Sequence, residues 1–502
     1  MKPVEQSFVA VDLGASHGRV VRGRFGADQF EFEEVRRFRN DWVESTDERG
    51  TTTLRWSTRD LFSEIVAALR QVAQSLAAGG GARVASVGVD TWGVDYGLFD
   101  GAGRLIEEPV AYRDARTTGA FERVFPIVPA AEIHAATGIQ LMPINTLFQL
   151  HAHVHSSAWP RNAVRLLPMP DVFHHLLCGS DVGEATHAST SQLVRCDTRD
   201  WDRELCRRLG IPASILPRLV PPGTRLGRLK AEVVRATGVD CEVVAPAAHD
   251  TASAVAATPL SEQTAYVSSG TWSLVGVELP APLVNDETFR ENCTNEGGAA
   301  GTTRFLKNVA GLWILEGCRK SWEQQGYALG WDGLERAIAR QPAWVAVIDP
   351  DDPAFFHPAD MAAAVRDFLQ RTGQPAPEEP GALARIVLES LALRCAEVLG
   401  TVARFSGRRL WAVRVIGGGS RNDFLNQALA DVTDLEILAG PAEATAIGNL
   451  LVQAVTAGRF RDLAEGRAYV AQMLPARRFQ PRGEATTEAA VERLRRILVS
   501  PR

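Results

Sequence analysis

The same strand–turn–strand pattern occurs near the start of each half of this 502-residue chain. Residues 9–21 hold two β-rich runs joined by the small residues Gly14 to Gly18, and residues 265–276 repeat the arrangement around Ser269 to Thr271. Short β-rich runs separated by a few small residues are typical of β-hairpins. A chain of this length needs more than one hydrophobic core. The repeated hairpin therefore predicts two domains of similar plan.

Helical and extended patterns around the hairpins place both halves in the α/β class. A helix is expected at residues 58–78 in the first half. In the second half, an apolar helix at 382–405 is followed by a buried strand at 411–416. Strands and helices that alternate in this way are typical of α/β domains. We therefore predict two α/β domains, one formed by residues 1–246 and the other by residues 247–502.

Composition and charge argue against several classes of function. The net charge of -6 disfavours a nucleic-acid-binding surface. The sequence contains no apolar run long enough to span a membrane, and its start lacks a signal-peptide segment. The seven cysteines are dispersed and form no C-x-x-C pair, a pattern typical of reduced thiols in a protein core. We therefore expect a cytoplasmic protein that binds neither nucleic acid nor membranes.

The stretch from Ala247 to Ala254 lies near the middle of the chain, where an apolar strand pattern changes to a helical one. It contains His249, Asp250 and Thr251. The common interpretation of Asp250 is a helix cap, because Asp accepts hydrogen bonds from the free N–H groups at a helix start. The alternative is a general base that takes a proton from a substrate hydroxyl. The stretch by itself favours the cap.

The small-residue turns offer what phosphoryl transfer needs. That reaction depends on backbone donors around the phosphates, a magnesium ion and a positioned base. The turns at 14–18 and 269–271 can supply the donors, and Gly417 to Gly419, after the strand at 411–416, leave room for a nucleoside. Asp12, at the entrance of the first turn, is a candidate Mg²⁺ ligand. Each glycine also has the simpler interpretation of a turn former.

Other chemistries lack their motifs. Ser268 to Gly270 lacks the flanking glycines of a hydrolase nucleophile elbow. The sequence contains neither a complete G-x-G-x-x-G after a strand nor a Walker A motif. His151, His153 and His155 lack a nearby carboxylate or Cys to complete a metal site, and on a helix only the first and last share a face. We expect this histidine cluster to be solvated or without a partner, and to bind no metal.

The order of these motifs resembles the FGGY family of carbohydrate kinases from about residue 8 to about residue 450. The segment Val11 to Ser16 and the central His249-Asp250-Thr251 match the wider family pattern. A narrower group within the family is matched by four further stretches, which are Asp90 to Asp95, Ser268 to Ser273, Thr294 to Gly298 and Leu306 to Asn308.

The resemblance implies an actin-like, ribonuclease-H-like fold in each half, with a catalytic cleft between the two domains. It places sugar binding in the first half and nucleotide binding in the second. The implied activity is the ATP- and Mg²⁺-dependent phosphorylation of L-rhamnulose at its 1-hydroxyl, a step in L-rhamnose breakdown. Another ketose, such as L-fuculose or L-xylulose, is the alternative substrate. An actin-like ATPase that transfers no phosphate to sugar is the alternative class, and the retained Asp250 disfavours it.

The resemblance also implies a role for individual residues. Asp250 is expected to be the base, and Asp12 is expected to lie near Mg²⁺. The expected sugar contacts are Gly93, Asp95, His249, Asp250, Thr251 and Asn308. The expected ATP contacts are Ala15, Ser16, His17, Gly18, Arg19, Thr271, Glu316 and Gly418.

Two of these positions depart from the family pattern. His17 stands in a turn where a small Ser is usual. Glu316 stands where a Gln is expected, and phosphate repels a carboxylate unless that carboxylate faces the ribose or the base. Neither change affects Asp250, so we expect activity to survive both.

Overall fold

The computed structural model describes residues 6–46, 50, 52–78, 83–327, 330–356, 358–483 and 488–499. The chain forms two compact units, each assembled from separate stretches. The first comprises Met1–Pro259, Glu278–Phe305 and Ala444–Met473. The second comprises Leu260–Val277, Leu306–Glu443 and Leu474–Arg502. The predicted α/β class with two units is confirmed.

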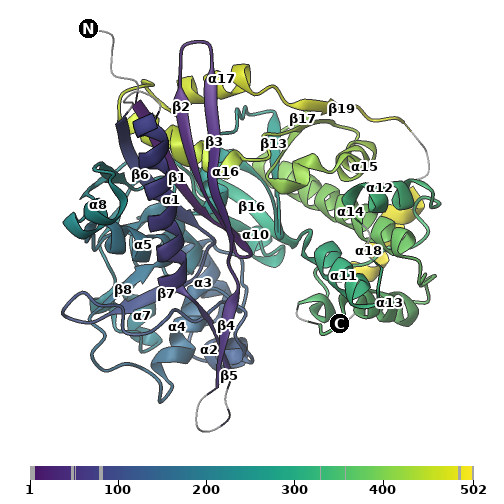
Figure 1. The fold of residues 1–502 in the computed structure, drawn as a ribbon. Coiled ribbons are helices and arrows are strands. Elements are labelled where there is room, and N and C mark those ends of the chain that lie inside the picture. The colour runs from purple at the N-terminus through teal and green to yellow at the C-terminus, as the bar shows by residue number, and fades with distance from the viewer. Residues whose placement is uncertain are drawn as a thin grey trace. The chain divides into compact units, whose positions relative to one another are not determined.

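A six-stranded sheet forms the centre of the first unit (Figure 1). Its strands are β1 (Gln6–Leu13), β2 (His17–Phe25), β3 (Phe30–Arg39), β6 (Arg83–Thr91), β11 (Arg225–Arg228) and β12 (Glu242–Val244). Their order is β11-β12-β6-β1-β2-β3, with β1 antiparallel to β2 and parallel to β6. The predicted first hairpin is therefore confirmed. All residues of β1 except the first are buried, as expected for a strand covered on both faces.

Helices cover this sheet. Its strands contact α1 (Thr58–Ala78), α5 (Met169–Cys178), α9 (Asp250–Ala256) and α16 (Ala444–Thr456). Helix α8 (Ala231–Thr237) packs on α1, and α17 (Leu463–Met473) packs on α16. The bounds of α1 are those predicted, and its buried side chains Leu61, Ile65 and Leu69 recur at helical spacing. Helix α16 packs against β1, β6 and α9. The segment around α16 therefore returns, late in the chain, to the sheet formed by the N-terminal strands.

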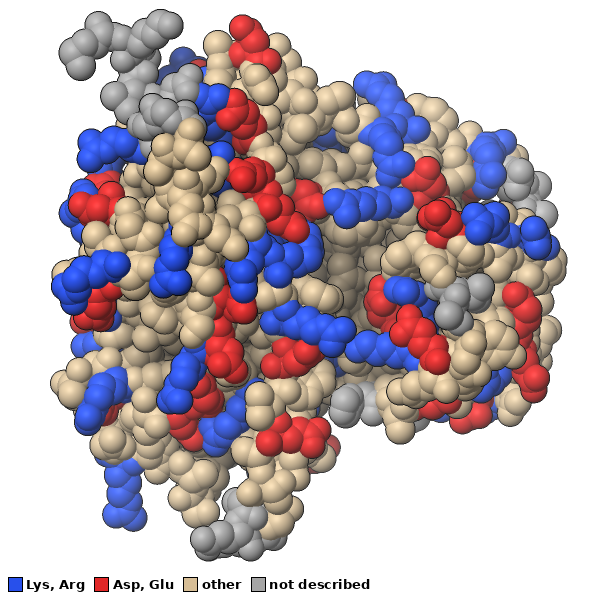
Figure 2. All heavy atoms as spheres, in the orientation of Figure 1, with Lys and Arg blue, Asp and Glu red and all other residues tan. Residues whose placement is uncertain are grey.

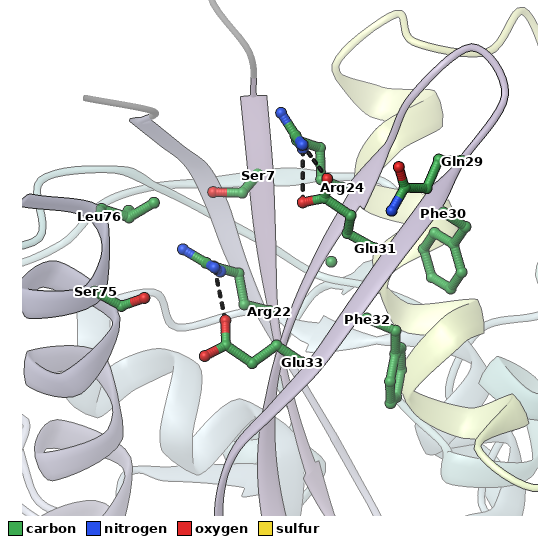
Figure 3. A pocket seen from close by; sticks show the side chains of 11 residues that line it. Ser7, Arg22, Arg24, Gln29, Phe30, Glu31, Phe32, Glu33, Ser75 and Leu76 are labelled. Atoms are coloured by element: carbon green, nitrogen blue, oxygen red, sulfur yellow. Dashed lines mark hydrogen bonds and ion pairs between the residues drawn. The ribbon is translucent and has the colours of Figure 1, made fainter. Parts of the chain in front are cut away.

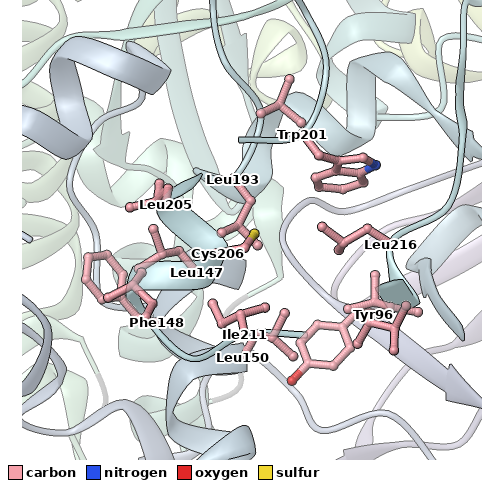
Figure 4. Packing of buried hydrophobic residues seen from close by; sticks show 14 of the residues in the cluster. Tyr96, Leu147, Phe148, Leu150, Leu193, Trp201, Leu205, Cys206, Ile211 and Leu216 are labelled. Atoms are coloured by element: carbon pink, nitrogen blue, oxygen red, sulfur yellow. The ribbon is translucent and has the colours of Figure 1, made fainter. Parts of the chain in front are cut away.

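Residues between β6 and β11 add a largely helical region with its own hydrophobic core (Figure 4). Buried Phe148, Leu205 and Trp201 belong to this core. The elements of this region are β7 (Tyr96–Phe99), η1 (Ala115–Thr117), α2 (Ala120–Val124), α3 (Ala130–Thr137), α4 (Thr146–Val154), β8 (Arg165–Pro168), β9 (Gly183–Glu184), α6 (Ala185–Ala188), η2 (Ser189–Ser191), α7 (Arg203–Arg208), η3 (Ala213–Ile215) and β10 (Leu219–Val220). The first unit also contains β4 (Trp42–Thr46), β5 (Thr52–Trp56) and α10 (Asp286–Arg290).

The expectation of a solvated or partner-free histidine cluster is wrong for His151 and His153 on α4, while His155, at the C-cap of that helix, is exposed but has a partner. His151 and His153 are buried. His153 bonds the Tyr96 hydroxyl through Nδ1 at 3.2 Å, and His155 bonds the Leu209 carbonyl through Nε2 at 3.0 Å. Burial is the main cause that lowers the pKa of His151 and of His153 to about 4. His151 and His153 are therefore neutral packing groups of the helical core, whereas His155 is exposed.

The second sheet repeats the plan of the first. Its strands are β13 (Thr264–Ser269), β14 (Trp272–Leu279), β15 (Thr294–Gly297), β16 (Thr303–Ala310), β17 (Ala412–Ile416), β18 (Glu436–Ala439) and β19 (Arg477–Phe479), in the order β15-β16-β14-β13-β17-β18-β19. As in the first sheet, a hairpin (β13 and β14) continues into strands parallel to its first strand. The second hairpin and the strand at 411–416 are confirmed, the latter starting one residue later.

The helices of the second unit are α11 (Trp313–Gln324), α12 (Trp331–Ala339), α13 (Met361–Arg371), α14 (Pro380–Ser406), α15 (Asp423–Thr433) and α18 (Glu488–Val499), with the 3-10 turns η4 (Pro353–Phe355) and η5 (Gly418–Arg421). Helix α14 confirms the apolar helix predicted at 382–405. It begins at Pro380, where the side chain of Glu379 accepts hydrogen bonds from the first free amides, and it ends before Gly407, which has a φ of 66°.

The surface charges, the cysteines and the character of the helices agree with the composition of the chain. Acidic and basic side chains are interspersed over the face shown in Figure 2. None of the seven cysteines forms a disulfide, and five of them are buried. None of the helices in the described part of the chain combines the length and apolar character that a membrane span requires.

Candidate active site

Asp12 and Asp90 stand side by side on neighbouring parallel strands of the first unit, where β1 pairs with β6. Asp12 forms an ion pair with Arg19, whose Nε and Nη2 atoms donate to its Oδ2 at 2.8 and 2.6 Å. Asp90 is fully buried and accepts a hydrogen bond from Asn449 at 2.6 Å, and its Oδ1 has no partner within the described residues. Burial and then the charge of Asp12 raise the pKa of Asp90 well above its usual range.

The turn between β1 and β2 is held by its own backbone and by one side chain from outside it. The Gly14 amide donates to the His17 carbonyl at 2.9 Å. Asn40 donates to the Gly14 carbonyl through its side-chain Nδ2 and to the Ser16 carbonyl through its backbone N–H. Gly18 has no room for a side chain, because a Cβ there would come within 2.2 Å of the Phe38 ring. The predicted ATP contacts Ala15 to Arg19 thus lie on the partly exposed turn and on the first residues of β2.

Asp250 is the first residue of α9, and His249 is the N-cap of that helix without a capping side-chain bond. The capping interpretation of Asp250 is therefore wrong, although its Oδ1 does accept the amide of the adjacent Thr251. Burial, followed by the charge of Asp12, raises the pKa of Asp250 to about 7. About a third of its side chain (32%) stays accessible to solvent. A carboxyl that titrates near neutral pH and is open to solvent has the properties of a general base.

The segment before α9 is anchored by Glu184, a buried acid from β9. Its carboxylate accepts hydrogen bonds from the amides of Thr186, His187 and Ala248. Burial raises the pKa of Glu184 to about 7 against the opposing effect of the Thr186 hydrogen bonds. Glu184 therefore ties α6 to the start of α9. Nothing local in the sequence distinguishes Glu184 from a surface acid, so its role was not predicted.

His249 contacts a group that sequence reasoning also missed. Its Nδ1 lies 3.0 Å from Arg304 Nη2 and 3.5 Å from Glu296 Oε2, while its Nε2 lies 3.3 Å from Asp250 Oδ1. Glu296 belongs to one of the four specific stretches, but no role was assigned to it. Arg304 is fully buried near the start of β16. A charged residue inside an apolar strand pattern is the signal that identifies it.

Gly93 and Asp95 belong to the turn between β6 and β7. A Cβ at Gly93 would come within 3.2 Å of His249 Nε2, so Gly93 keeps that nitrogen accessible. Val94 has a φ of 67°, an unfavourable conformation for a β-branched residue, and such strain is concentrated at functional sites. Asp95 is buried and accepts hydrogen bonds from the side chains of Trp56, Trp92 and Gln149. Asp95 therefore holds the turn in place.

In the second unit, the turn of the second hairpin packs against the glycine-rich turn after β17. A Cβ at Gly419 would lie 2.0 Å from Ser269 Oγ, and Gly417 has a φ of 79°. The Gly311 amide donates to the Thr271 carbonyl at 3.1 Å. Around Gly418, by contrast, a Cβ would meet open space. The structure thus brings Thr271 and Gly418 to one surface formed by closely packed backbone.

The two remaining predicted positions also lie in the second unit. Asn308 is on β16 and partly exposed. Glu316 is on the first turn of α11 and forms an ion pair with Arg319 at 3.1 Å. The Arg319 guanidinium also lies over the Trp331 ring. The neighbouring cation reduces the repulsion between the Glu316 carboxylate and a phosphate.

A hollow of about 610 Å³ on the first unit is formed by β2, β3 and the end of α1 (Figure 3). Its charged side chains pair with each other across the strands, Arg22 with Glu33 at 2.7 Å and Arg24 with Glu31. None of the candidate residues above lines it. The hollow therefore offers no chemistry comparable to the acids near Asp250.

Comparison with known protein families gives matches in both halves of the chain. Residues 9–257 match the N-terminal domain, and residues 265–457 the C-terminal domain, of the FGGY family of carbohydrate kinases. The chain belongs to this family, as the order of its motifs predicted.

Individual relatives extend over nearly the whole chain. The chain is 42% identical to the rhamnulokinase of Bacteroides thetaiotaomicron, over 97% of this chain and 98% of the relative. It is 37% identical to the rhamnulokinase of Enterococcus faecalis, over 95% and 94%. In fold it is similar to the crystal structure of gluconate kinase from Lactobacillus acidophilus, with a TM-score of 0.79 at 14% identity over 98% and 97% of the chains.

Proposed function

We propose that the protein transfers a phosphoryl group from ATP to the 1-hydroxyl of L-rhamnulose, which yields L-rhamnulose 1-phosphate in L-rhamnose catabolism. The observation that carries this proposal is the end-to-end similarity to rhamnulokinases, at 42% identity over 97% of the chain. The geometry around Asp250 supports it, because a carboxyl with a pKa of about 7 can accept a hydroxyl proton at neutral pH.

In this proposal Asp250 is the general base, and the sugar lies against residues that surround it. His249 and Thr251 flank Asp250 in sequence, and Gly93 leaves the His249 ring accessible. Asp95 contributes to sugar binding because it holds the turn that contains Gly93 in place. Asn308 adds a polar contact from β16. The proton of the sugar hydroxyl moves to Asp250 as the oxygen attacks the terminal phosphorus of ATP.

The nucleotide, in the same proposal, is bound by the two hairpin turns and their surroundings. In the first unit, the phosphates are bound by the backbone amides of Ala15, Ser16, His17 and Gly18 and by the side chain of Arg19. In the second unit, the nucleotide is contacted by Thr271, Gly418 and Glu316. We propose residues 1–246 as the sugar-side domain and residues 247–502 as the nucleotide-side domain, although Ala15 to Arg19 of the former contribute to nucleotide binding and Asp250 of the latter contributes to the sugar site.

The donor atoms near Asp12 suit a magnesium ion. Mg²⁺ keeps several of its waters and is usually bound through one or two carboxylates and the substrate phosphates. Asp12 provides such a carboxylate, and ionisation of its neighbour Asp90, whose Oδ1 is buried without a partner in the described residues, would provide a second. The described residues contain no group of three or more potential ligands that would form an all-protein cage. Bound there, Mg²⁺ would neutralise negative charge on the phosphates.

We also propose that the protein acts in the cytoplasm, with a small ketose and ATP as its partners. Seven free thiols, most of them buried, are compatible with a reducing compartment.

The test is ADP release from purified protein with Mg-ATP against L-rhamnulose, L-fuculose, L-xylulose and a no-sugar control. We expect release to depend strongly on L-rhamnulose. Preference for another ketose would replace the substrate and keep the mechanism. Release that does not respond to any sugar would instead support the ATPase alternative and contradict the proposal.

The pH dependence of the reaction provides a second test. Desolvation and the charge of Asp12 raise the pKa of Asp250, and the hydrogen bonds from Thr251 and then the charge of Arg304 oppose them, with a net value of about 7. A base is lost when it is protonated, so kcat/KM for the sugar should fall about tenfold per pH unit below about pH 7 and level off above it. Initial rates from about pH 5.5 to 8.5 measure this. Glu204→Gln, a change to an exposed acid, is the control, and a rate independent of pH would contradict the assignment.

A further inference from the structure

Arg304 is a buried cation adjacent to the proposed base, and none of the roles above involves it. Its side chain is fully inaccessible to solvent. Its Nε donates to the Gly297 carbonyl at 2.9 Å, and its Nη2 lies 3.0 Å from Glu296 Oε2. These two contacts, both to β15, fix the plane of the guanidinium. The same Nη2 atom lies 3.0 Å from Nδ1 of His249.

The contact between Arg304 and His249 determines which ring nitrogen of His249 carries the proton. A guanidinium donates hydrogen bonds and cannot accept them. The nitrogen that faces it must therefore offer a lone pair, so Nδ1 of His249 is the acceptor. The ring is neutral, because burial and then the charge of Arg304 lower the pKa of His249 well below its usual range. A neutral ring has one proton, which consequently lies on Nε2.

The other groups around the ring agree with this assignment. Glu296 would favour a proton on Nδ1, but at 3.5 Å its carboxylate is a weaker contact than the Arg304 nitrogen at 3.0 Å. On the opposite side, Nε2 lies 3.3 Å from Asp250 Oδ1 and next to the space left by Gly93. The His187 ring approaches edge-on with its centroid 6.3 Å away, and its own Nε2 bonds the Trp92 carbonyl.

We propose that Arg304 is a positioning residue that, held by Glu296, occupies the Nδ1 lone pair of His249 and fixes the ring as the Nε2-protonated tautomer. His249 is then an obligatory hydrogen-bond donor toward Asp250 and toward an oxygen of the bound sugar. It cannot act as a second general base, because its only lone pair is engaged. The sugar-facing part of this inference rests on the proposed kinase function, whereas the tautomer does not.

The tautomer is measurable in the full-length protein without any ligand. Histidine labelled with ¹⁵N gives ring-nitrogen signals that distinguish protonated from unprotonated nitrogens, and the signal of His249 is the one lost in His249→Gln. We expect Nε2 protonated and Nδ1 unprotonated. A proton on Nδ1, or on both nitrogens near neutral pH, overturns the proposal. In Arg304→Met we expect a shift toward the other tautomer, and an unchanged tautomer in folded Arg304→Met equally overturns it.

If Arg304→Met does not fold, the spectrum of the unaltered protein still decides the tautomer, and two variants of His249 test the donor. The Gln side chain can place an N–H group near the position of Nε2, whereas Asn reaches only as far as Nδ1. We expect kcat/KM for the sugar to fall about tenfold less in His249→Gln than in His249→Asn, as one hydrogen bond to a charged or polar partner predicts. Equal losses overturn the donor role. Absence of sugar kinase activity in the unaltered protein refutes the proposed function and leaves the tautomer result intact.

Discussion

Asp250→Asn is expected to lower the turnover number about a hundredfold to ten-thousandfold, the range typical for loss of a general base. The amide that replaces the carboxylate has nearly the same shape and can still accept the Thr251 amide through its oxygen. It cannot take the proton of a sugar hydroxyl. Binding of the ketose and of ATP should therefore persist while the chemical step fails.

The stability of this variant should stay close to that of the unaltered protein. The charge of Asp12 disfavours ionised Asp250, and the neutral amide removes that repulsion. ADP release at saturating substrates, titration calorimetry with the sugar and a thermal unfolding curve together separate loss of base from loss of fold. Asp240→Asn, which changes an exposed acid paired with Arg228, is the control and should leave turnover unchanged. Turnover of Asp250→Asn within tenfold of normal would remove Asp250 from its role.

Local patterns predicted much of this fold. Small residues between β-rich runs identified both hairpins, and the spacing of Leu61, Ile65 and Leu69 identified α1 with its observed bounds. The hairpins and α1 depend on residues that are close together in the chain, so they can be predicted from the sequence alone. The same holds for the position of His249 and Asp250 at a strand-to-helix junction. The roles of the individual site residues stay predictions until they are tested.

Contacts between distant residues were not predictable in the same way. Glu184 accepts the amide of Ala248 across 64 positions, and Asn449 donates to Asp90 across 359. Arg304 reaches His249 from a strand 55 positions away. Each pair forms only because the sheet and its helices bring the residues together. A single sequence gives no sign of such partners beyond an isolated charge in an apolar segment.

The two wrong expectations have the same physical origin. His151 and His153 were expected to be solvated or without a partner because no carboxylate or Cys near them completes a metal site, but α4 is buried on most sides within the helical core. Asp250 was first interpreted as a cap because acids are common at helix starts, but the helix begins at Asp250 itself. In both cases the surroundings of the residue, rather than its type, determine what it does.

Gly448 is the position where a single methyl group should do the most damage to the first unit. It lies on α16 where that helix crosses α9, and an added Cβ would come within 1.7 Å of the Ser253 carbonyl oxygen and 2.6 Å of its carbon. Both are backbone atoms of α9, so no side-chain rotation can relieve the contact. The helices would have to separate, which would also move the next residue, Asn449, away from Asp90.

Gly448→Ala is therefore expected to destabilise the protein by about 2–4 kcal/mol, the upper range for overpacking, despite a gain in helix propensity of about 1 kcal/mol. For a unit of this size, this corresponds to a fall of about 3–6 °C in the midpoint of thermal unfolding. Gly400→Ala is the matched control, because Gly400 also lies within a helix and a Cβ there would meet open space. The control should gain up to about 1 kcal/mol. If both variants instead unfold at similar temperatures, α9 and α16 are not packed backbone to backbone, and the support that α16 gives to the Asp90 and Asp250 segments is absent.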